Sequence, residues 1–219
     1  METIPFILKE FKPFALDTKI ADVTLFFKET AFSHFPIVKN NKLIGLVSKF
    51  DVDEIEADEK KLEDFIYLIK LFFVESSENL LELIKAFAVN EANLVPVIKE
   101  EFTYLGYLDL IDILHVYNET PFLNDEGVVL QLEKEIQDFS FSQVCQIVET
   151  NKGKVLGLFI SETTGAIVKI TLKFNAREIN EIIQTFRRYN YSVLSKHKED
   201  FYIEDLKERS DYLQKYLNI

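Results

Sequence analysis

Polar residues that can form hydrogen bonds recur in two pairs with the same spacing. Ser48 and Asp51 form the first pair, and Asp109 and Asp112 return in the same spacing 61 residues later. An ionised carboxylate only accepts hydrogen bonds, whereas a serine hydroxyl also donates. The chain has no glycine-rich phosphate loop, nucleophile elbow or paired histidine–carboxylate motif. No catalytic constellation is evident in the sequence, so we expect the protein not to be an enzyme.

These pairs belong to a longer internal repeat. Residues 33–38 (Ser-His-Phe-Pro-Ile-Val) return at 93–98, with Pro36 and Pro96 in register, and residues 45–51 return at 106–112. Two copies are too few for a solenoid. We therefore predict a pseudo-symmetric pair, each copy burying its apolar face against the other, with a cleft suited to a small ligand.

Each copy is expected to contribute a helix, a two-stranded hairpin and a second helix. In the first copy, Asp17-Thr18 is expected to cap a helix from about Ile20, and Asp51 to cap the helix after the hairpin. The hairpin strands are predicted over 34–38 and 43–48, with a turn over 39–42. The second copy follows with a helix from Leu80, strands 94–98 and 104–108, and a helix ending near Val116. The apolar run 65–74 repeats the lead 6–14, and it is too short to span a bilayer.

The second half of the chain has a different pattern. Strands are predicted over 128–132, 154–160, 166–174 and 191–194. Helices are expected from Ser140 or Ser142 to Val148 and from the capping box of Asn175 and Glu178 to about Tyr189. This order, strand-helix-strand-strand-helix-strand, is typical of a split βαβ fold. We expect an α+β protein: a pair over 1–118 (copies about 1–60 and 61–118), a linker over 119–126, a domain over 127–204 and a terminal helix over 205–219.

Composition and charge narrow the classes of partner. The 219 residues are 47% hydrophobic and carry a net charge of −12. An acidic chain repels phosphate backbones, so we expect no nucleic acid partner. No secretory leader or membrane-spanning run is evident, so we expect a cytoplasmic protein with no membrane role.

Other chemistry-bearing residues have structural explanations. Cys145, the only cysteine, lies in an apolar pattern and is interpreted as a core residue rather than a nucleophile. The acidic run 51–59 lacks the glycine of a calcium loop at its sixth position, so a solvated helix face is expected. His34, His115 and His197 show no metal-ligand spacing. Arg187 and Arg188 at a predicted helix end favour compensation of the helix dipole over an anion site.

Each repeat resembles a CBS domain, named for cystathionine beta-synthase. The matching residues are His34-Phe35-Pro36-Ile37-Val38, Gly45 within 43–47, and the pair Ser48 and Asp51. Together the copies are similar to a tandem CBS pair, or Bateman module. The resemblance implies no required cofactor and an adenosine-type ligand between the copies: AMP, ADP, ATP or S-adenosylmethionine. It implies that Asp51 accepts from the ribose hydroxyls, Ser48 donates to a phosphate or ribose oxygen, and the His34-Phe35 backbone beside Pro36 edges the adenine.

The second pocket implied by this resemblance is altered. It would be formed by Leu94, Val95, Pro96, Asp109 and Asp112. Asp109 stands where the first copy has Ser48, and a carboxylate repels a phosphate. That pocket is therefore expected to be empty, to hold an uncharged or cationic ligand, or to be structural.

The first pocket also has features that bear on its ligand. Residues 1–118 contain no arginine, which leaves lysines such as Lys49 as weaker phosphate contacts, so we expect polyphosphates to bind weakly. His34 is either a pH-sensitive element beside the pocket or a packed loop histidine.

Residues 127–204 resemble an ACT domain in the order and length of their elements. Members of that family bind amino acids at the turn from the first strand to the first helix, near a glycine. Here residues 134–140 contain no glycine, which disfavours an amino-acid site without deciding the question. Members also pair through their sheets, which implies a homodimer.

These features predict a regulatory or sensor protein whose regulated activity lies on a partner protein. The alternative is a structural or protein-interaction module with vestigial pockets and dimerisation as its main role.

Overall fold

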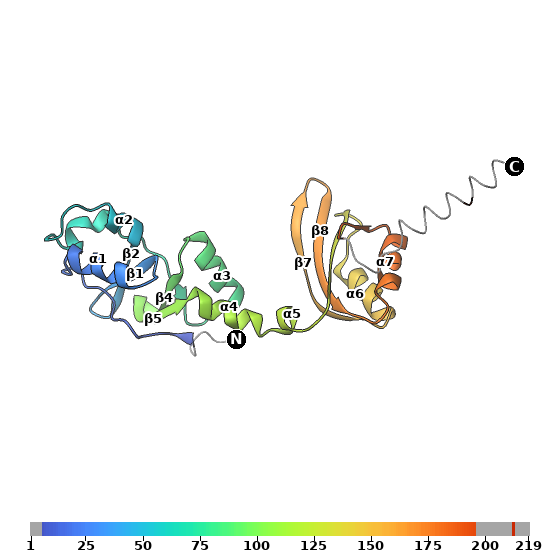
Figure 1. Ribbon diagram of the computed structural model, residues 1–219, viewed down its shortest axis with the longest axis horizontal. Helices are drawn as coiled ribbons and strands as arrows, with labels where there is room; N and C mark the ends of the chain where they lie inside the picture. The colour runs from blue at the N-terminus through green and yellow to red at the C-terminus, as the bar shows by residue number, and fades with distance from the viewer. Residues whose placement is uncertain (1–5, 196–211, 213–219) are drawn as a thin grey trace. The chain divides into compact units, whose positions relative to one another are not determined.

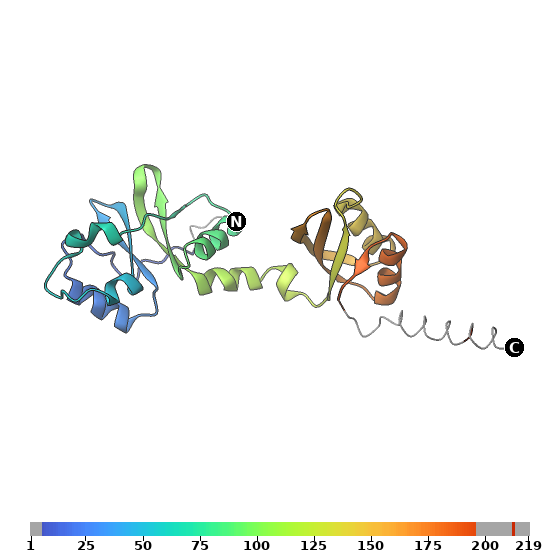
Figure 2. The same cartoon turned by 90° about the horizontal axis from the view of Figure 1, so that it is seen from above.

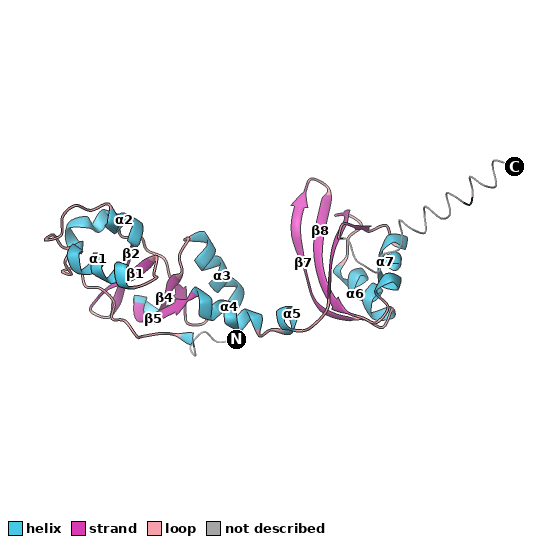
Figure 3. Cartoon of the chain, in the orientation of Figure 1, coloured by secondary structure: helices cyan, strands magenta, loops and turns pink. Residues whose placement is uncertain are grey.

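The computed structural model describes residues 6–195 and Tyr212. The chain divides into two compact units, Met1–Tyr117 and Asn118–Ile219. Each unit combines helices with an antiparallel or largely antiparallel sheet, which confirms the predicted mixed α+β class (Figure 3). The terminal helix predicted over 205–219 lies outside the described residues, apart from Tyr212.

The first unit is built from the two repeats around one five-stranded sheet with the order β1-β2-β5-β4-β3 (Figure 1). The first repeat contributes α1 (Ile20–Glu29), β1 (His34–Lys39), β2 (Lys42–Ser48) and α2 (Lys49–Asp53). The second contributes η2 (Leu62–Leu68), β3 (Val74–Glu75), α3 (Leu80–Val89), β4 (Leu94–Lys99), η3 (Glu100–Phe102), β5 (Thr103–Asp109) and α4 (Leu110–Asn118). The predicted repeat of helix, hairpin and helix is therefore confirmed.

The two hairpins turn in different ways. Asn40 and Asn41 both adopt left-handed backbone angles, with φ of 52° and 62°, as the predicted asparagine turn requires. The second hairpin turns through the 3₁₀ segment η3, where Glu101 and Phe102 have φ of 57° and 61°.

The N-terminal segment of each repeat (the lead segment, residues 6–14 and 65–74) pairs with the second hairpin strand of the other repeat. Leu46 and Lys70 exchange both of their backbone hydrogen bonds, and so do Tyr107 and Leu8. The crossing places Lys70, which precedes β3, against β2 of the first repeat. The structural counterpart of Lys70 is therefore Leu8.

The repeats also meet at a pair of residues 60 positions apart. The Asn93 side-chain oxygen accepts from the Ser33 backbone N–H at 2.8 Å and from its hydroxyl at 3.0 Å. The Asn93 backbone N–H in turn donates to the Ser33 hydroxyl at 3.0 Å. This reciprocal contact fixes the two hairpins relative to each other where the pseudo-symmetry relates them.

The core of the first repeat is aromatic. The ring of Phe35 is completely buried and packs against Phe14, Phe26 and Phe32, with centroids 4.3 to 5.5 Å apart. Leu94 and Tyr107 of the second repeat join the same cluster. The rest of the second repeat buries a more aliphatic cluster around Leu83, Val95, Val97 and Leu108.

Two predicted helix caps in the first unit are wrong. The side chain of Ser48, not of Asp51, caps α2, because the Ser48 hydroxyl accepts from the Asp51 backbone N–H. Helix α1 begins at Ile20 as predicted, but its N-cap Lys19 makes no side-chain cap. The Thr18 hydroxyl accepts from Ala15 N–H in the preceding turn instead.

The second unit has the predicted split βαβ order around a sheet of order β7-β8-β6-β9. Its elements are α5 (Pro121–Asn124), β6 (Val128–Glu135), α6 (Phe141–Thr150), β7 (Lys154–Thr164), β8 (Ile167–Asn175), α7 (Ile179–Arg188) and β9 (Ser192–Val193). Helices α6 and α7 cover one face of this sheet, as the view from above also shows (Figure 2). Alternate residues of β8 from Val168 to Phe174 are buried beneath them.

On the opposite face, the Phe122 ring of α5 lies over Gly157, where a Cβ would come within 2.3 Å of the ring. Helix α7 begins at Ile179, and its N-cap Glu178 makes no side-chain cap, so the predicted capping box at Asn175 is wrong. Arg187 and Arg188 lie in its last turn, as predicted. Cys145 is half-buried, and burial raises the pKa of its thiol.

Candidate functional site

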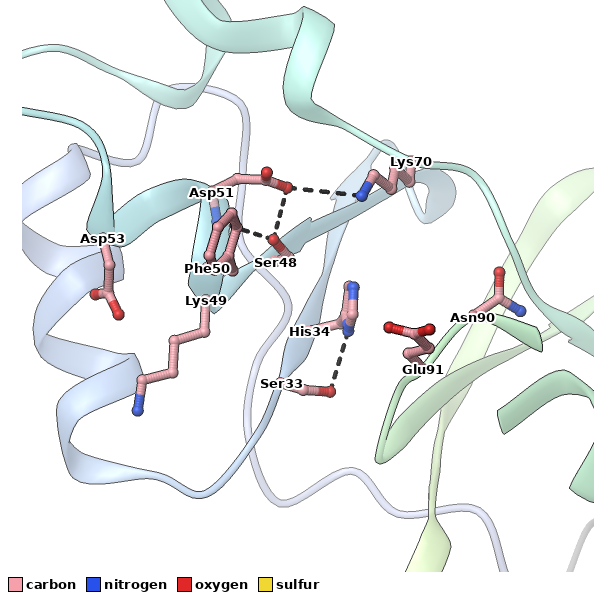
Figure 4. Close-up of a pocket in the computed structure, with 10 residues that line it drawn as sticks. All are labelled: Ser33, His34, Ser48, Lys49, Phe50, Asp51, Asp53, Lys70, Asn90 and Glu91. Atoms are coloured by element: carbon pink, nitrogen blue, oxygen red, sulfur yellow. Dashed lines mark hydrogen bonds and ion pairs between the residues drawn. The ribbon is translucent and has the colours of Figure 1, made fainter. Parts of the chain in front are cut away.

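A cavity of about 540 Å³ opens between the two repeats of the first unit (Figure 4). The first repeat lines it from the start of β1, the end of β2 and helix α2, through Ser33, His34, Ser48, Lys49, Phe50, Asp51 and Asp53. The second repeat lines it through Lys70 in its lead and Asn90 and Glu91 after α3. His34, Ser48 and Asp51, three of the five residues predicted for the first pocket, are brought together here.

Ser48 and Asp51 are bonded to each other. The Ser48 hydroxyl donates to Asp51 Oδ2 at 2.6 Å and accepts from the Asp51 backbone N–H at 3.0 Å. The three-residue spacing produces this geometry, because the last residue of β2 is also the N-cap of α2. The carboxylate is thereby held at the cavity wall with its side chain 18% exposed.

Lys70 supplies the nearest positive charge to this carboxylate. Its ammonium nitrogen lies 3.9 Å from Asp51 Oδ2, and its side chain is 66% exposed. An ion pair with one partner this exposed contributes little to stability. It does leave the ammonium group at the mouth of the cavity, where a ligand can reach it.

His34 lies between the repeats at the start of β1. Its Nδ1 is 3.0 Å from the Ser33 hydroxyl, and its ring makes an edge contact with Phe72. Burial lowers the pKa of the His34 imidazole, Lys70 lowers it further, and Asp51 partly opposes the shift. Because the proton binds more weakly in the folded state, the neutral imidazole is the form that the fold favours.

This depressed pKa predicts a dependence of stability on pH. The unfolded chain takes up a proton at His34 as the pH falls through 6.5, before the folded chain does, so the free energy of unfolding should fall below that pH. We expect His34→Asn to flatten this fall, measured by urea unfolding between pH 7.5 and 5.5. The exposed His115 in α4 provides the matched substitution, and His115→Asn should keep the wild-type slope. Equal slopes for wild type and His34→Asn would contradict the assignment.

Two other residues predicted for the first pocket do not line the cavity. Phe35 and Pro36 follow His34 in β1, and both are buried. Phe35 points into the aromatic core of the first repeat. The two residues support the wall from behind.

The residues predicted for the second pocket are placed differently from those of the first. Leu94, Val95 and Pro96 are buried, the first two in the hydrophobic cores. Asp109 Oδ1 accepts from the Ile111 backbone N–H at 2.7 Å, and Asp112 is exposed on α4. This half of the unit lacks the serine–aspartate pair of the first half, and Leu8 stands at the counterpart of Lys70.

Sequence reasoning missed three residues that the second repeat contributes to the cavity. The signal that could have found Lys70 is its position as the one charged residue of the otherwise apolar run 65–74. Asn90 and Glu91 follow α3, and no sequence motif marks them. All three reach the first repeat because the two copies pack against each other, which a linear pattern does not reveal.

The described part of the chain offers no alternative metal or membrane site. Within residues 6–195 and Tyr212, no group of three or more histidine, cysteine, aspartate or glutamate side chains could hold a metal ion. No helix of that same part is long and apolar enough to cross a membrane.

Comparison with known proteins supports the resemblance of the first repeat. The CBS domain family model matches residues 7–57. An uncharacterized protein of Methanocaldococcus jannaschii is 29% identical over 99 residues, which are 45% of this chain and 37% of that protein. The chain thus spans well under half the length of this curated relative.

Solved structures that match part of this chain include a CBS domain pair/ACT domain protein from Thermotoga maritima. It is 18% identical with a TM-score of 0.48, covering 54% of this chain and 98% of that one. CBSX2 in complex with AMP is 16% identical with a TM-score of 0.44, covering 53% of this chain and 95% of that one. The match to the family model covers the segment that carries Ser48 and Asp51, so residues 7–57 of this chain are similar to a CBS domain.

Proposed function

We propose that the chain is a non-enzymatic regulatory protein that binds one adenosine-type ligand in the cavity between its repeats. The observation that carries the proposal is the cavity itself, which places Asp51, Ser48 and His34 on one wall and residues of the second repeat on the other. Its volume of about 540 Å³ lies within the range of small-molecule sites.

In this proposal the Asp51 carboxylate accepts a hydrogen bond from a ribose hydroxyl. Among the described residues, the Ser48 hydroxyl and the Lys70 ammonium group both contact Oδ2. No hydrogen bond or ion pair of the described residues is found at the second oxygen, Oδ1, so its acceptor capacity is left for a ligand hydroxyl. A carboxylate that accepts from a hydroxyl forms a charge-assisted hydrogen bond, which is stronger than a neutral one.

Phe50 offers a surface for the base. Its side chain lines the cavity and is 72% exposed, which is unusual for a phenylalanine that no partner covers. Any purine or pyrimidine can stack on an aromatic face. Stacking at Phe50 would therefore add affinity without selecting one base over another. Base contact at Phe50 and ribose contact at Asp51 together would hold a nucleoside.

Ligand binding between the repeats supports a regulatory role. A ligand that contacts both repeats favours the arrangement in which both walls fit it, and this differential affinity shifts the population of states. The regulated activity would then lie on a partner protein. The candidate ligands differ in charge: they are AMP, ADP, ATP and S-adenosylmethionine. Because residues 1–118 contain no arginine, we expect the polyphosphates among them to bind most weakly.

A thermal-shift screen of the whole chain tests this function. A ligand that binds only the folded state raises the unfolding midpoint, by an amount that grows with its concentration. We expect the unfolding midpoint to rise with adenosine or AMP at millimolar concentration. Ribose 5-phosphate, which lacks the base, should not raise it at the same ionic strength. Unchanged midpoints with every adenosine compound would reject the proposal.

The alternative function, an interaction module with a vestigial pocket, has one observation in its favour. The Asp51 carboxylate already has two partners within the protein, the Ser48 hydroxyl and the Lys70 ammonium group. These polar groups therefore need no ligand to complete their contacts. Under this alternative the midpoint stays constant in the same screen.

We also propose that the second unit forms a homodimer. Within residues 6–195 and Tyr212, strand β7 pairs only with β8 and forms an edge of its sheet, with Phe159 and Ile160 46% and 43% exposed. An uncovered edge strand pairs readily with another strand. Sedimentation equilibrium should give twice the chain mass, and a monomer at high micromolar concentration would contradict this proposal.

A further inference from the structure

Glu91 lines the cavity at a position where a glutamate is unfavourable, both for its backbone conformation and for its charge at the end of a helix. It follows Asn90, the C-cap of α3, and adopts a left-handed conformation with φ of 50°. Glycine normally fills this position because it has no Cβ, and asparagine tolerates the conformation better than most other residues, whereas a glutamate is strained there. The carboxylate also lies at the negative end of the helix dipole, where an anion is unfavourable.

The fold of the repeat does not require a glutamate here. The corresponding residue of the first repeat, 60 positions earlier, is Ala31. The C-cap of helix α1 is Thr30, which has an extended backbone. Its hydroxyl donates a hydrogen bond to the Phe26 carbonyl. Local strain that structure does not demand is characteristic of binding sites.

Glu91 changes the charge of the cavity. With it, the lining holds three carboxylates (Asp51, Asp53 and Glu91) and two ammonium groups (Lys49 and Lys70). Lys70 is already engaged with Asp51. In Figure 4 the Glu91 carboxylate extends toward the side of the cavity that holds His34. The α3 side of the cavity, formed by Glu91 and the carbonyl end of that helix, is therefore negative, whereas Lys70 of the same repeat places its positive charge beside Asp51.

We propose that Glu91 determines which adenosine-type ligand the cavity accepts, favouring a cationic 5′ substituent and opposing a phosphate. The inference rests on the proposed function, because it presupposes that adenosine itself binds. A positive group such as an ammonium or sulfonium is attracted to the Glu91 carboxylate, and a phosphate is repelled by it. The residue thus acts on the ligand directly, through charge.

A charge series of matched ligands tests the inference. The probes are 5′-amino-5′-deoxyadenosine, adenosine and AMP, which share the base and ribose and carry a positive, neutral and negative 5′ group. Titration calorimetry of the full chain should give affinities that decrease in that order. In Glu91→Gln we expect about threefold to tenfold weaker binding of the amine and a similar gain for AMP, with adenosine changed less than about twofold.

Glu101→Gln is the matched control. Glu101 is also a left-handed glutamate of the second repeat, but it lies in the η3 turn, where its carboxylate contacts Lys42. The substitution removes the same net charge outside the cavity lining, so it should leave the order and spacing of the three affinities unchanged. The effect at Glu91 should also shrink at high salt.

The outcomes separate the two proposals. If wild type binds none of the three probes, the nucleoside function fails. If adenosine binds but the affinities of the amine and of AMP are the same in wild type and Glu91→Gln, the role of Glu91 is overturned and the nucleoside function stands. If Glu101→Gln shifts the series as much as Glu91→Gln, the effect is one of net charge, and the inference is again overturned.

Discussion

Replacing Asp51 by asparagine is expected to weaken adenosine binding by about 10- to 100-fold, because a hydrogen bond to a charged acceptor contributes about 1.5–3 kcal/mol. Asparagine keeps the shape of the side chain and one acceptor oxygen. It removes the charge that polarises a ribose hydroxyl and that pairs with Lys70. Titration calorimetry with adenosine measures the change.

Asp53→Asn is the control for this prediction. Asp53 belongs to the same short helix and also lines the cavity, so the substitution removes the same charge nearby. We expect less than about a threefold effect, because Asp53 is exposed and its charge is screened. Tight adenosine binding that survives Asp51→Asn would remove Asp51 from the site.

Replacing Gly45 by alanine is expected to destabilise the chain by about 2–4 kcal/mol, through backbone strain and a forced displacement. Gly45 has φ of 155°, and a Cβ there would lie 2.8 Å from the Lys70 carbonyl oxygen and 2.5 Å from an Ile69 methyl carbon. Relief of this contact must push the lead segment away from β2. Because that segment carries Lys70 into the cavity, ligand binding should weaken together with stability.

Gly165→Ala isolates the contact from the backbone strain. Gly165 also has a positive φ, 59°, but a Cβ there meets nothing within 4 Å. We expect it to lose only about 1 kcal/mol, the strain of a left-handed alanine. Urea unfolding of both variants gives the comparison. Equal losses would mean that the close approach of the lead segment is not essential to the fold.

The local parts of this fold could be predicted from the sequence. Paired asparagines at 40 and 41 predicted the first hairpin turn, and the alternation of residues 166–174 predicted β8. The repeat of Pro36 and Pro96 predicted two equivalent hairpins. In each case the signal lies within a few residues of the structure that it specifies.

The non-local parts could not be predicted in this way. The cavity depends on the crossing of the lead segments, which brings Lys70 to β2, and on the packing of α3, which brings Glu91 to the opposite wall. The cap of α2 was assigned to Asp51 because an aspartate commonly caps a helix, but Ser48 precedes it and reaches the backbone N–H first. The cavity is therefore not encoded in local spacing, whereas the cap is a local feature that was assigned to the wrong residue.

The repeat also conceals an asymmetry that bears on function. The first half of the unit combines Ser48 with Asp51 and receives Lys70, whereas the second half has Asp109 and Leu8 at the corresponding positions. Duplication thus explains the fold of both halves. The ligand chemistry is concentrated in one cavity, which agrees with the proposal of a single adenosine-type ligand.

A crystal structure of the full chain grown with saturating adenosine tests the central claim most directly. We predict adenosine in the cavity between the repeats, with a ribose hydroxyl within about 2.6–3.0 Å of an Asp51 carboxylate oxygen and the base against Phe50. Adenosine bound elsewhere on the chain, or a cavity that holds only solvent under these conditions, would contradict the account.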